Sequence, residues 1–485
     1  MSAVQRIAKN TTILLVAQVA SYLLSFFYMM YTARYLGPAS FGILSFAVAF
    51  TGIFTVFSDL GLQLLTVREV ARDKSLAPKY LVNVSLMKII LVTITFGLIA
   101  LTINLMGYPH ETILVVYLLG LSIVFSAFTQ MFYSIFQAFE RMEFQSIGQM
   151  LNAALILGGV IFAIRYGFGV VGVASLFVIA SIIALAYSFA IMKLKFSNST
   201  LALVAKAVEF DWSFWKPTIK QALPFGLIAL FAAIFYSMDT VMLSFIKGDA
   251  VVGWYNAAYR MVLVLLFIPA AWSSAIFPVM SKFYITSSDS LRFSFEKSFK
   301  YLAMLGIPIG VGTTLLAQRF ILLIFGIEYA PSVIALQILI WSVVITYVGG
   351  SIGTLLQTTN NQMVFAKIVG VAAFINVVLN LIFIPKYSYI AASIIATLTV
   401  LISAILQYIA SLQIGMNLIT RKFFLFFGKI VLASIIMGVF INYSRNMTLI
   451  LLIPLAALIY FVTVFILKFF DKEDILIIRQ LINKE

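Results

Sequence analysis

Long apolar runs recur along the whole chain, and they constrain its fold more than any other feature. Runs interrupted by charged residues, Gly/Pro or Asn clusters mark fourteen candidate helices, each long enough to cross the ~30 Å hydrocarbon core of a bilayer. They lie near 11–33, 41–64, 80–106, 112–138, 146–164, 170–192, 222–245, 252–277, 299–318, 332–357, 365–384, 389–413, 425–442 and 447–468. Apolar residues make up 63% of the 485 positions and charged residues 10%, which leaves too little polar surface for a soluble globule. We therefore expect an all-α integral membrane protein with 14 transmembrane helices.

The basic residues fall mainly on one side of this topology. An even number of spans puts both termini on the same side. If that side is cytoplasmic, 25 of the 32 Lys and Arg residues lie in cytoplasmic segments, 6 in outer segments and 1, Arg260, inside a span. This bias predicts a multi-pass protein of the cell (plasma) membrane with both termini cytoplasmic. Attraction of the basic loops to anionic membrane lipids accounts for the net charge of +15 without nucleic acid as a partner.

Several classes of function are excluded by what the sequence lacks. It has no cysteine and a single histidine, His110, so a thiolate or histidine metal site and a Ser-His triad are implausible. It has no GxxxxGK[ST] motif for ATP. Gly167, Gly169 and Gly172 match GxGxxG, but the next acidic residue, Glu209, is too distant for a dinucleotide site. We expect no enzyme, no catalytic residues, no metal and no cofactor, with H+ or Na+ as candidate coupling ion.

An internal resemblance divides the chain into two halves. With an offset of 211 residues, Gly37 aligns with Gly248, Gly42 with Gly253 and Ala47 with Ala258. We predict two pseudo-symmetric six-helix lobes, an N-lobe at 1–195 and a C-lobe at 222–415, followed by two C-terminal helices and a cytoplasmic tail at 416–485. The cytoplasmic linker at 196–221 contains either an interfacial amphipathic helix or an ordinary segment that touches the membrane. Parallel repeats of this kind are a transporter plan with the substrate site between the halves.

Motifs in both halves resemble those of prokaryotic polysaccharide flippases, the O-antigen and oligosaccharide exporter branch of the multidrug/oligosaccharidyl-lipid/polysaccharide superfamily. They include AxxLGxxxFGxxxxAxA from Ala33, DLGLxxxxxREVAR at 59–72, KQALPFG at 220–226 and NVVLNLIFIPKY at 376–387. The resemblance covers nearly the whole chain. The sequence departs from the pattern at Ser388 and Ala391, where such flippases often carry glycines.

The resemblance implies a function and a set of partners. It implies alternating-access translocation of a lipid-linked oligosaccharide, on a polyprenyl phosphate or diphosphate carrier, from the cytoplasmic to the outer leaflet through a cationic cavity lined by spans 1, 2, 7 and 8. The partners would be this lipid-linked glycan, membrane lipids, and glycosyltransferases or a polymerase. The alternative is an ion-coupled drug/cation antiporter of the same superfamily. A membrane enzyme is disfavoured because the outer loops are short, and a channel because the chain has two repeats.

Ionisable residues inside spans are the strongest signals of a site, because each is costly in hydrocarbon. Asp239 in span 7 and Arg260 in span 8 lie at similar depth. Arg260 either presents its guanidinium to a substrate phosphate, with Asp239 holding or releasing it, or forms a permanent ion pair with Asp239. Asp239 is also a candidate for ion coupling.

Three further charged residues are candidates for gating or binding. Arg34 ends span 1 on the outer side, where it either guides a phosphate and closes the outer gate or reaches the interface as a snorkelling residue. Asp59 ends span 2 and Lys88 enters span 3. Those two form a gating or ion-coupling pair across the inner half, or Lys88 snorkels to the cytoplasmic headgroups, which is the interpretation we favour here.

Aromatic residues gather at the outer ends of spans 7 and 8. Tyr236 and Tyr259, with Trp254 and Tyr255, could stack on sugar rings of a glycan. The aromatic belt found at membrane interfaces explains the same residues without a ligand, and it is the favoured interpretation.

Overall fold

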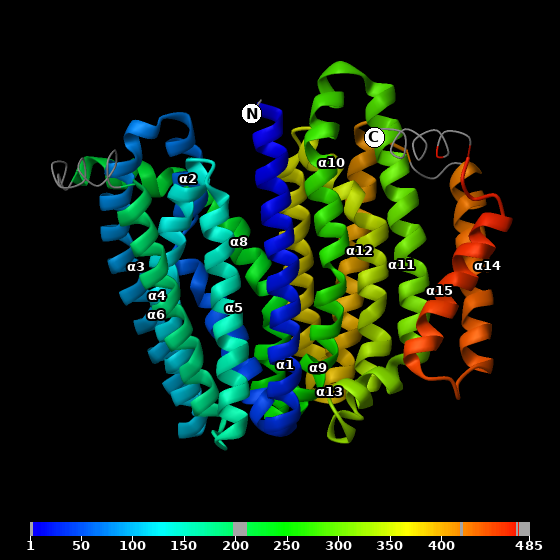
Figure 1. The fold of residues 1–485 in the computed structure, drawn as a ribbon, viewed down its shortest axis with the longest axis horizontal. Coiled ribbons are helices and arrows are strands. Elements are labelled where there is room, and N and C mark those ends of the chain that lie inside the picture. The colour runs from blue at the N-terminus through cyan, green and yellow to red at the C-terminus, as the bar shows by residue number, and fades with distance from the viewer. Residues whose placement is uncertain (1–2, 197–210, 418–420, 472–473, 475–485) are drawn as a thin grey trace. The chain divides into compact units, whose positions relative to one another are not determined.

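A computed structural model describes residues 3–196, 211–417, 421–471 and 474 (Figure 1). In that part of the chain all regular secondary structure is helical. The first half contains α1 (Ala3–Thr55), η1 (Val56–Ser58), α2 (Leu62–Arg72), η2 (Lys74–Leu76), α3 (Ala77–Leu105), α4 (His110–Ala138), α5 (Met142–Arg165) and α6 (Val170–Phe196). The second contains α8 (Trp212–Lys247), α9 (Asp249–Leu265), α10 (Phe267–Thr286), α11 (Ser288–Ile324), η4 (Ile327–Tyr329), α12 (Ser332–Thr358), α13 (Gln362–Gln413), α14 (Arg421–Tyr443) and α15 (Leu449–Ile466).

Two of these helices are each two membrane spans. α1 has 53 residues and α13 has 52, so each would be almost 80 Å long if straight, more than twice the thickness of the hydrocarbon core. Both reverse direction at a non-helical residue, Gly37 in α1 and Ser388 in α13. The described residues contain 12 continuous apolar stretches long enough to span a membrane, and these two reversals bring the number of spans to fourteen. The predicted fold class is confirmed.

The side of α3 that faces away from the protein has the character of a lipid contact. Ile94, Leu98, Leu101 and Leu105 are all exposed and recur at the three- and four-residue spacing of one helical face. An apolar face of this length in water would promote aggregation, whereas in a bilayer it contacts acyl chains.

The internal repeat is visible in the backbone. Gly37 has φ 72° and ψ 174°, and its predicted counterpart Gly248 has φ 86° and ψ 176°. Each glycine turns the chain sharply between two consecutive spans, in a region of φ that residues with a Cβ atom rarely adopt. The alignment of the two halves therefore predicted a shared local structure correctly.

Ser388 adopts a comparable reversal without being a glycine. Its φ is 57° and its ψ is −143°, a conformation that costs a residue with a side chain about 1–3 kcal/mol. The departure from the flippase pattern at this position therefore places strain in the turn between spans 11 and 12. The other departure, Ala391, lies within the following helix and is buried.

We expect Ser388→Gly to stabilise the protein by about 1 kcal/mol, because the strain relieved exceeds the ~0.5–1 kcal/mol of backbone entropy that glycine adds to the unfolded state. The measurement is the thermal unfolding midpoint in detergent. Ala391→Gly is the matched control, and it should destabilise by about 1 kcal/mol because it places glycine inside a helix. A lower midpoint for Ser388→Gly would show that the turn is not strained.

The described chain forms two compact units. The first comprises Met1–Val264, Ile324–Tyr329 and Val369–Ala392, and the second Leu265–Leu323, Ala330–Ile368 and Ser393–Glu485. In the first unit, α3 to α6 lie side by side (Figure 1). In the second, α14 and α15 form a helical pair (Figure 1). The predicted lobes and linker limits remain a prediction, and most of the predicted amphipathic segment lies outside the described residues.

Glycines pack helices closely in the second unit. A Cβ atom added to Gly306 would lie 2.7 Å from Tyr347, and one added to Gly310 would lie 2.4 Å from Val344. α11 and α12 can therefore approach so closely only because these positions lack side chains.

Candidate functional site

Asp239 is a buried carboxylate held by a tyrosine of the next helix. It lies on α8, and only 3% of it is exposed. Its Oδ2 accepts a hydrogen bond of 2.5 Å from the hydroxyl of Tyr255 on α9, while its Oδ1 is buried without a hydrogen-bond partner among the described residues. The carboxylate is thus half satisfied, which is costly in a water-poor interior.

Arg260 lies further along α9 and is not paired with Asp239. Its Nε is buried without a hydrogen-bond partner, and no ion pair within the described part of the chain includes its guanidinium. The Tyr28 hydroxyl on α1 and the Tyr259 hydroxyl lie within its electrostatic range. The permanent Asp239–Arg260 ion pair considered from the sequence is therefore absent among these residues. Tyr28 was not identified from the sequence, because an isolated tyrosine in an apolar span carries no distinctive pattern.

Tyrosines connect this region of α8 and α9. The Tyr259 hydroxyl donates to the backbone carbonyl of Tyr236 at 3.4 Å, and its ring is stacked on Tyr255, with centroids 5.7 Å apart. Tyr255 is fully buried, whereas 51% of Tyr236 is exposed. Of these tyrosines, Tyr236 has the ring surface for contact with a sugar or with lipid, and Tyr255 serves to hold Asp239.

Arg34 lies three residues before the reversal at Gly37. Its side chain is exposed and takes part in no hydrogen bond or ion pair with the residues described. Both interpretations of this residue therefore stay predictions: an exposed arginine at the end of a span suits contact with a phosphate as well as with the interface.

Lys88 and Asp59 form an ion pair inside the first unit. Lys88 Nζ lies 2.5 Å from Asp59 Oδ1, and Lys88 is 0% exposed while 25% of Asp59 is exposed. Asp59 Oδ2 also accepts from the backbone N–H of Gln63 at the start of α2. The span ends here because Leu60 and Gly61 take φ values of 48° and 86°. The structure contradicts the snorkelling interpretation of Lys88, since a fully buried ammonium does not reach the headgroups.

The start of α8 is fastened to α3 by polar contacts that sequence reasoning missed. Asp211 caps α8 and pairs with Lys79 at 2.7 Å. Asn83 Oδ1 accepts from the Trp215 indole N–H at 3.1 Å and from the Asp211 backbone N–H at 3.2 Å. The hydrogen bonds from Lys79 and Ser213 lower the pKa of Asp211 to about 2. Trp215 lies within the linker expected at 196–221, but its partner Asn83 lies in a distant span.

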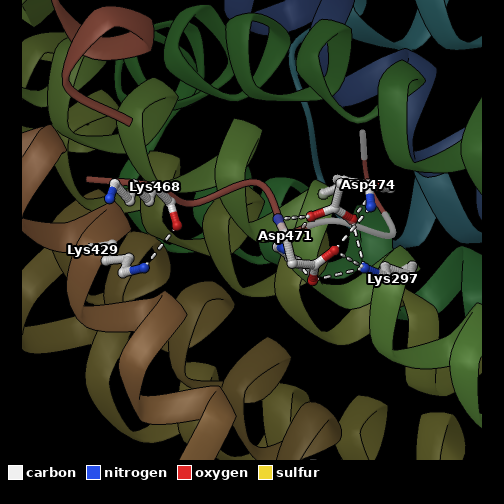
Figure 2. A network of polar contacts seen from close by, with 7 residues as sticks. Lys297, Lys429, Lys468, Asp471 and Asp474 are labelled. Atoms are coloured by element: carbon white, nitrogen blue, oxygen red, sulfur yellow. Dashed lines mark hydrogen bonds and ion pairs between the residues drawn. The ribbon is translucent and has the colours of Figure 1, made fainter. Parts of the chain in front are cut away.

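A second unrecognised cluster joins the segment after α15 to α11. Lys297 and Lys300 lie one helical turn apart and contact Asp471 and Asp474, with Lys297 Nζ 2.9 Å from Asp471 Oδ1 and 2.6 Å from Asp474 Oδ1. Figure 2 shows Lys297 reaching toward both carboxylates. Burial raises the pKa of Asp474, but hydrogen bonds from Lys297, Lys300 and Tyr301 outweigh it and hold the pKa below its ordinary value. These ion pairs thus join the segment after α15, the last helix without a counterpart in the repeat, to α11 within the second unit.

One cavity in the second unit is lined mainly by apolar side chains. Its volume is about 460 Å³, and α11, α12, α13 and α14 line it, with residues such as Ile307, Val344, Leu401 and Phe427. Most of its lining side chains are aliphatic or aromatic, and no charged residue lines it. Among the described residues, no three His, Asp or Glu side chains are grouped so that they could hold a metal ion.

The fold is shared with solved transporters. The lipid II flippase MurJ, in an inward closed conformation, superimposes with a TM-score of 0.73 over 92% of this chain and 97% of its own, at 18% identity. An inward-facing multidrug resistance transporter of the MATE family has a TM-score of 0.66 over 81% of this chain and 95% of its own, at 17% identity. At these identities the similarity establishes the fold alone.

Sequence comparison gives the family. The capsular polysaccharide biosynthesis protein CapF of Staphylococcus aureus is 25% identical over 411 residues, which are 82% of this chain and 98% of CapF. The family model described as "Polysaccharide biosynthesis protein" matches residues 7–284, more than half of the chain. This protein is therefore a multi-pass membrane protein that belongs to the polysaccharide biosynthesis protein family.

Proposed function

We propose that this protein is a flippase, which moves a lipid-linked oligosaccharide on a polyprenyl phosphate or diphosphate from the cytoplasmic to the outer leaflet of the cell membrane. Membership of the polysaccharide biosynthesis family supports a glycan substrate, and the fold shared with the lipid II flippase MurJ supports the flipping of a lipid-linked glycan. The transport step makes and breaks no covalent bond.

The observation that carries this proposal is that the guanidinium of Arg260 forms no ion pair with the described residues and that its Nε is buried without a hydrogen-bond partner among them. A cation inside a membrane span is costly unless it has a partner, and Asp239, the partner that the sequence suggested, accepts a hydrogen bond from Tyr255 instead. A phosphate group supplies the missing partner, because guanidinium and phosphate form two parallel charge-assisted hydrogen bonds. Arg260 would then replace water around the phosphate while the substrate crosses.

The remaining parts of the mechanism are expectations of the same proposal. Arg34 would meet the phosphate at the outer end, and the exposed ring of Tyr236 would contact sugars. Since the sequence has no ATP motif, an ion gradient (H+ or Na+), the membrane potential or removal of the product would drive transport, with Asp239 and Asp59 as coupling candidates. Both termini would be cytoplasmic, and glycosyltransferases or a polymerase would supply or consume the substrate.

The alternative is an ion-coupled drug/cation antiporter. The fold shared with a MATE multidrug transporter favours it, as does the half-satisfied carboxylate of Asp239, which could receive a cation. A site built for cations would pair its acidic residues with the drug and would have no need of an arginine inside a membrane span. We therefore prefer an anionic substrate.

The test is the leaflet sidedness of the lipid-linked oligosaccharide in cells depleted of the protein, measured with a glycan-modifying reagent that does not cross membranes. The proposal predicts that the precursor accumulates on the inner leaflet and that the wild-type protein restores outer-leaflet labelling. Unchanged sidedness, together with greater sensitivity to cationic drugs, would overturn the flippase and support the antiporter.

A further inference from the structure

Two spans that follow the equivalent glycine turns meet backbone to backbone in the first unit. A Cβ atom on Gly42 would lie 1.8 Å from the carbonyl oxygen of Asp249, and one on Gly253 would lie 2.0 Å from the carbonyl oxygen of Pro38. Real Cβ atoms do not approach other atoms closer than 3.0 Å. Even an alanine at either position would therefore force the second half of α1 and the start of α9 apart by about an ångström or more.

The two contacts are the same contact seen from both halves of the repeat. The offset of 211 residues maps Pro38 onto Asp249 and Gly42 onto Gly253. Gly42 touches the counterpart of Pro38, and Gly253 touches Pro38 itself. A pair of this kind is self-complementary, as in the interface of a two-fold symmetric dimer, so the crossing lies on the pseudo-two-fold axis that relates the repeats.

Other turns expected on the outer side close around this crossing. Phe41, beside Gly42, is fully buried and its ring lies 6.2 Å from that of Tyr329 in η4. The Tyr329 hydroxyl donates to the Ala33 carbonyl at 2.8 Å, and the Trp254 indole N–H donates to the Glu328 carbonyl at 3.1 Å. The turn between α11 and α12 therefore contacts α1 on both sides of the Gly37 reversal and is hydrogen-bonded to α9.

We propose that the reciprocal Gly42–Gly253 crossing, with Tyr329 above it, is the outer seal, the contact that separates each time the protein opens to the outer side. A contact between two bare backbones has no interlocking side chains, so it can separate and re-form without changes of rotamer. Because each half supplies the same two positions of the repeat, a symmetric rocking of the repeats opens both contacts at once. This inference rests on the proposed alternating-access transport, but not on the nature of the substrate.

The absence of cysteine from the sequence gives a direct test. Ala33→Cys places a small thiol at a residue that is 0% exposed beside Tyr329, and Ala39→Cys, at an exposed position, normalises the labelling. Cells carrying either variant are treated with a maleimide that does not cross the membrane. We expect Gly42→Ala and Gly253→Ala each to raise labelling of Ala33→Cys several-fold, and to equal extents, because either substitution disfavours the sealed state.

A third glycine of the same helix is the matched control. A Cβ atom on Gly52 would meet nothing within 4 Å, so Gly52→Ala should leave labelling of Ala33→Cys unchanged. Labelling that is the same in all three alanine variants would overturn the seal. So would a rise for only one of Gly42 and Gly253, because the reciprocity would then be wrong.

A further measurement applies if an alanine variant does not reach the membrane. In that case Ala33→Cys with both glycines intact is labelled over many transport cycles. Slow, cumulative labelling supports an opening seal, and complete protection overturns it. Labelling needs no substrate, so its result is independent of the flippase test. Unchanged lipid sidedness together with the expected labelling would support the proposed outer seal and contradict the proposed flippase function.

Discussion

Replacing Lys88 by methionine is expected to destabilise the protein by about 3–5 kcal/mol, because it leaves the Asp59 carboxylate without its ion-pair partner. Methionine keeps the length of the side chain in a position that is fully buried, so the loss reports the charge rather than a cavity. Asp59→Asn should cost as much or more, since it leaves a fully enclosed ammonium unpaired while retaining an oxygen for the N–H of Gln63. The measurement is the thermal unfolding midpoint in detergent.

The double variant, Lys88→Met with Asp59→Asn, distinguishes a structural role of the ion pair from a role in gating or ion coupling. Removing both charges should recover most of the stability, because a neutral pair of similar volume has no desolvation cost. If the pair serves only the fold, the double variant transports normally. If it gates or couples transport, the double variant is stable and inactive. Stability losses that simply add would show that the two charges do not interact.

The chain provides a matched control on the same helix. Lys79 of α3 pairs with Asp211 at 2.7 Å, but 45% of its side chain is exposed. An ion pair screened by solvent contributes about 0–1 kcal/mol, so Lys79→Met should have a small effect. A loss as large as that of Lys88→Met would show that helix α3 tolerates no loss of a lysine, whatever its burial.

Counting residues along a span gives an expected depth in the membrane, but it does not give the direction of a side chain around the helix. Counting residues from the ends of spans placed Asp239 and Arg260 at similar depth. Successive residues of a helix are rotated by about 100°, so Tyr255 and Arg260 lie about 140° apart around α9. The face that presents Tyr255 to Asp239 therefore directs Arg260 elsewhere, and only the packing of α8 on α9 fixes which of the two faces Asp239.

The same limit explains Lys88. Lys88 lies two turns into a span, from where its side chain could extend to the headgroups or point into the protein. The sequence around it is compatible with both orientations. What decides is the left-handed turn at Leu60 and Gly61, which ends the preceding span with Asp59 beside α3. By contrast, the turns at Gly37 and Gly248 were predictable as equivalent, because a backbone conformation that excludes most side chains leaves glycine in both halves of the repeat.

Replacing Arg260 by glutamine is expected to lower the rate of flipping on the order of 10- to 100-fold while leaving the thermal midpoint unchanged or higher. The loss of rate follows from removing a charge-assisted hydrogen bond to phosphate, worth about 1.5–3 kcal/mol. The stability should not fall, because the Nε of Arg260 is buried without a hydrogen-bond partner among the described residues, which costs free energy in the absence of substrate. The measurement is the translocation of a fluorescent polyprenyl-diphosphate glycan in proteoliposomes, alongside thermal unfolding.

Two companion variants separate a phosphate ligand from a structural ion pair. Arg260→Lys keeps the charge but not the paired hydrogen bonds, so it should lose less activity than Arg260→Gln. Asp239→Asn should not rescue Arg260→Gln, because Asp239 bonds to Tyr255 rather than to the guanidinium. Rescue by Asp239→Asn, or a fall in stability that parallels the fall in rate, would assign Arg260 to the fold. In that case the cation would have to be sought elsewhere, and Arg34, exposed beside the turn at Gly37, would be the next residue to replace.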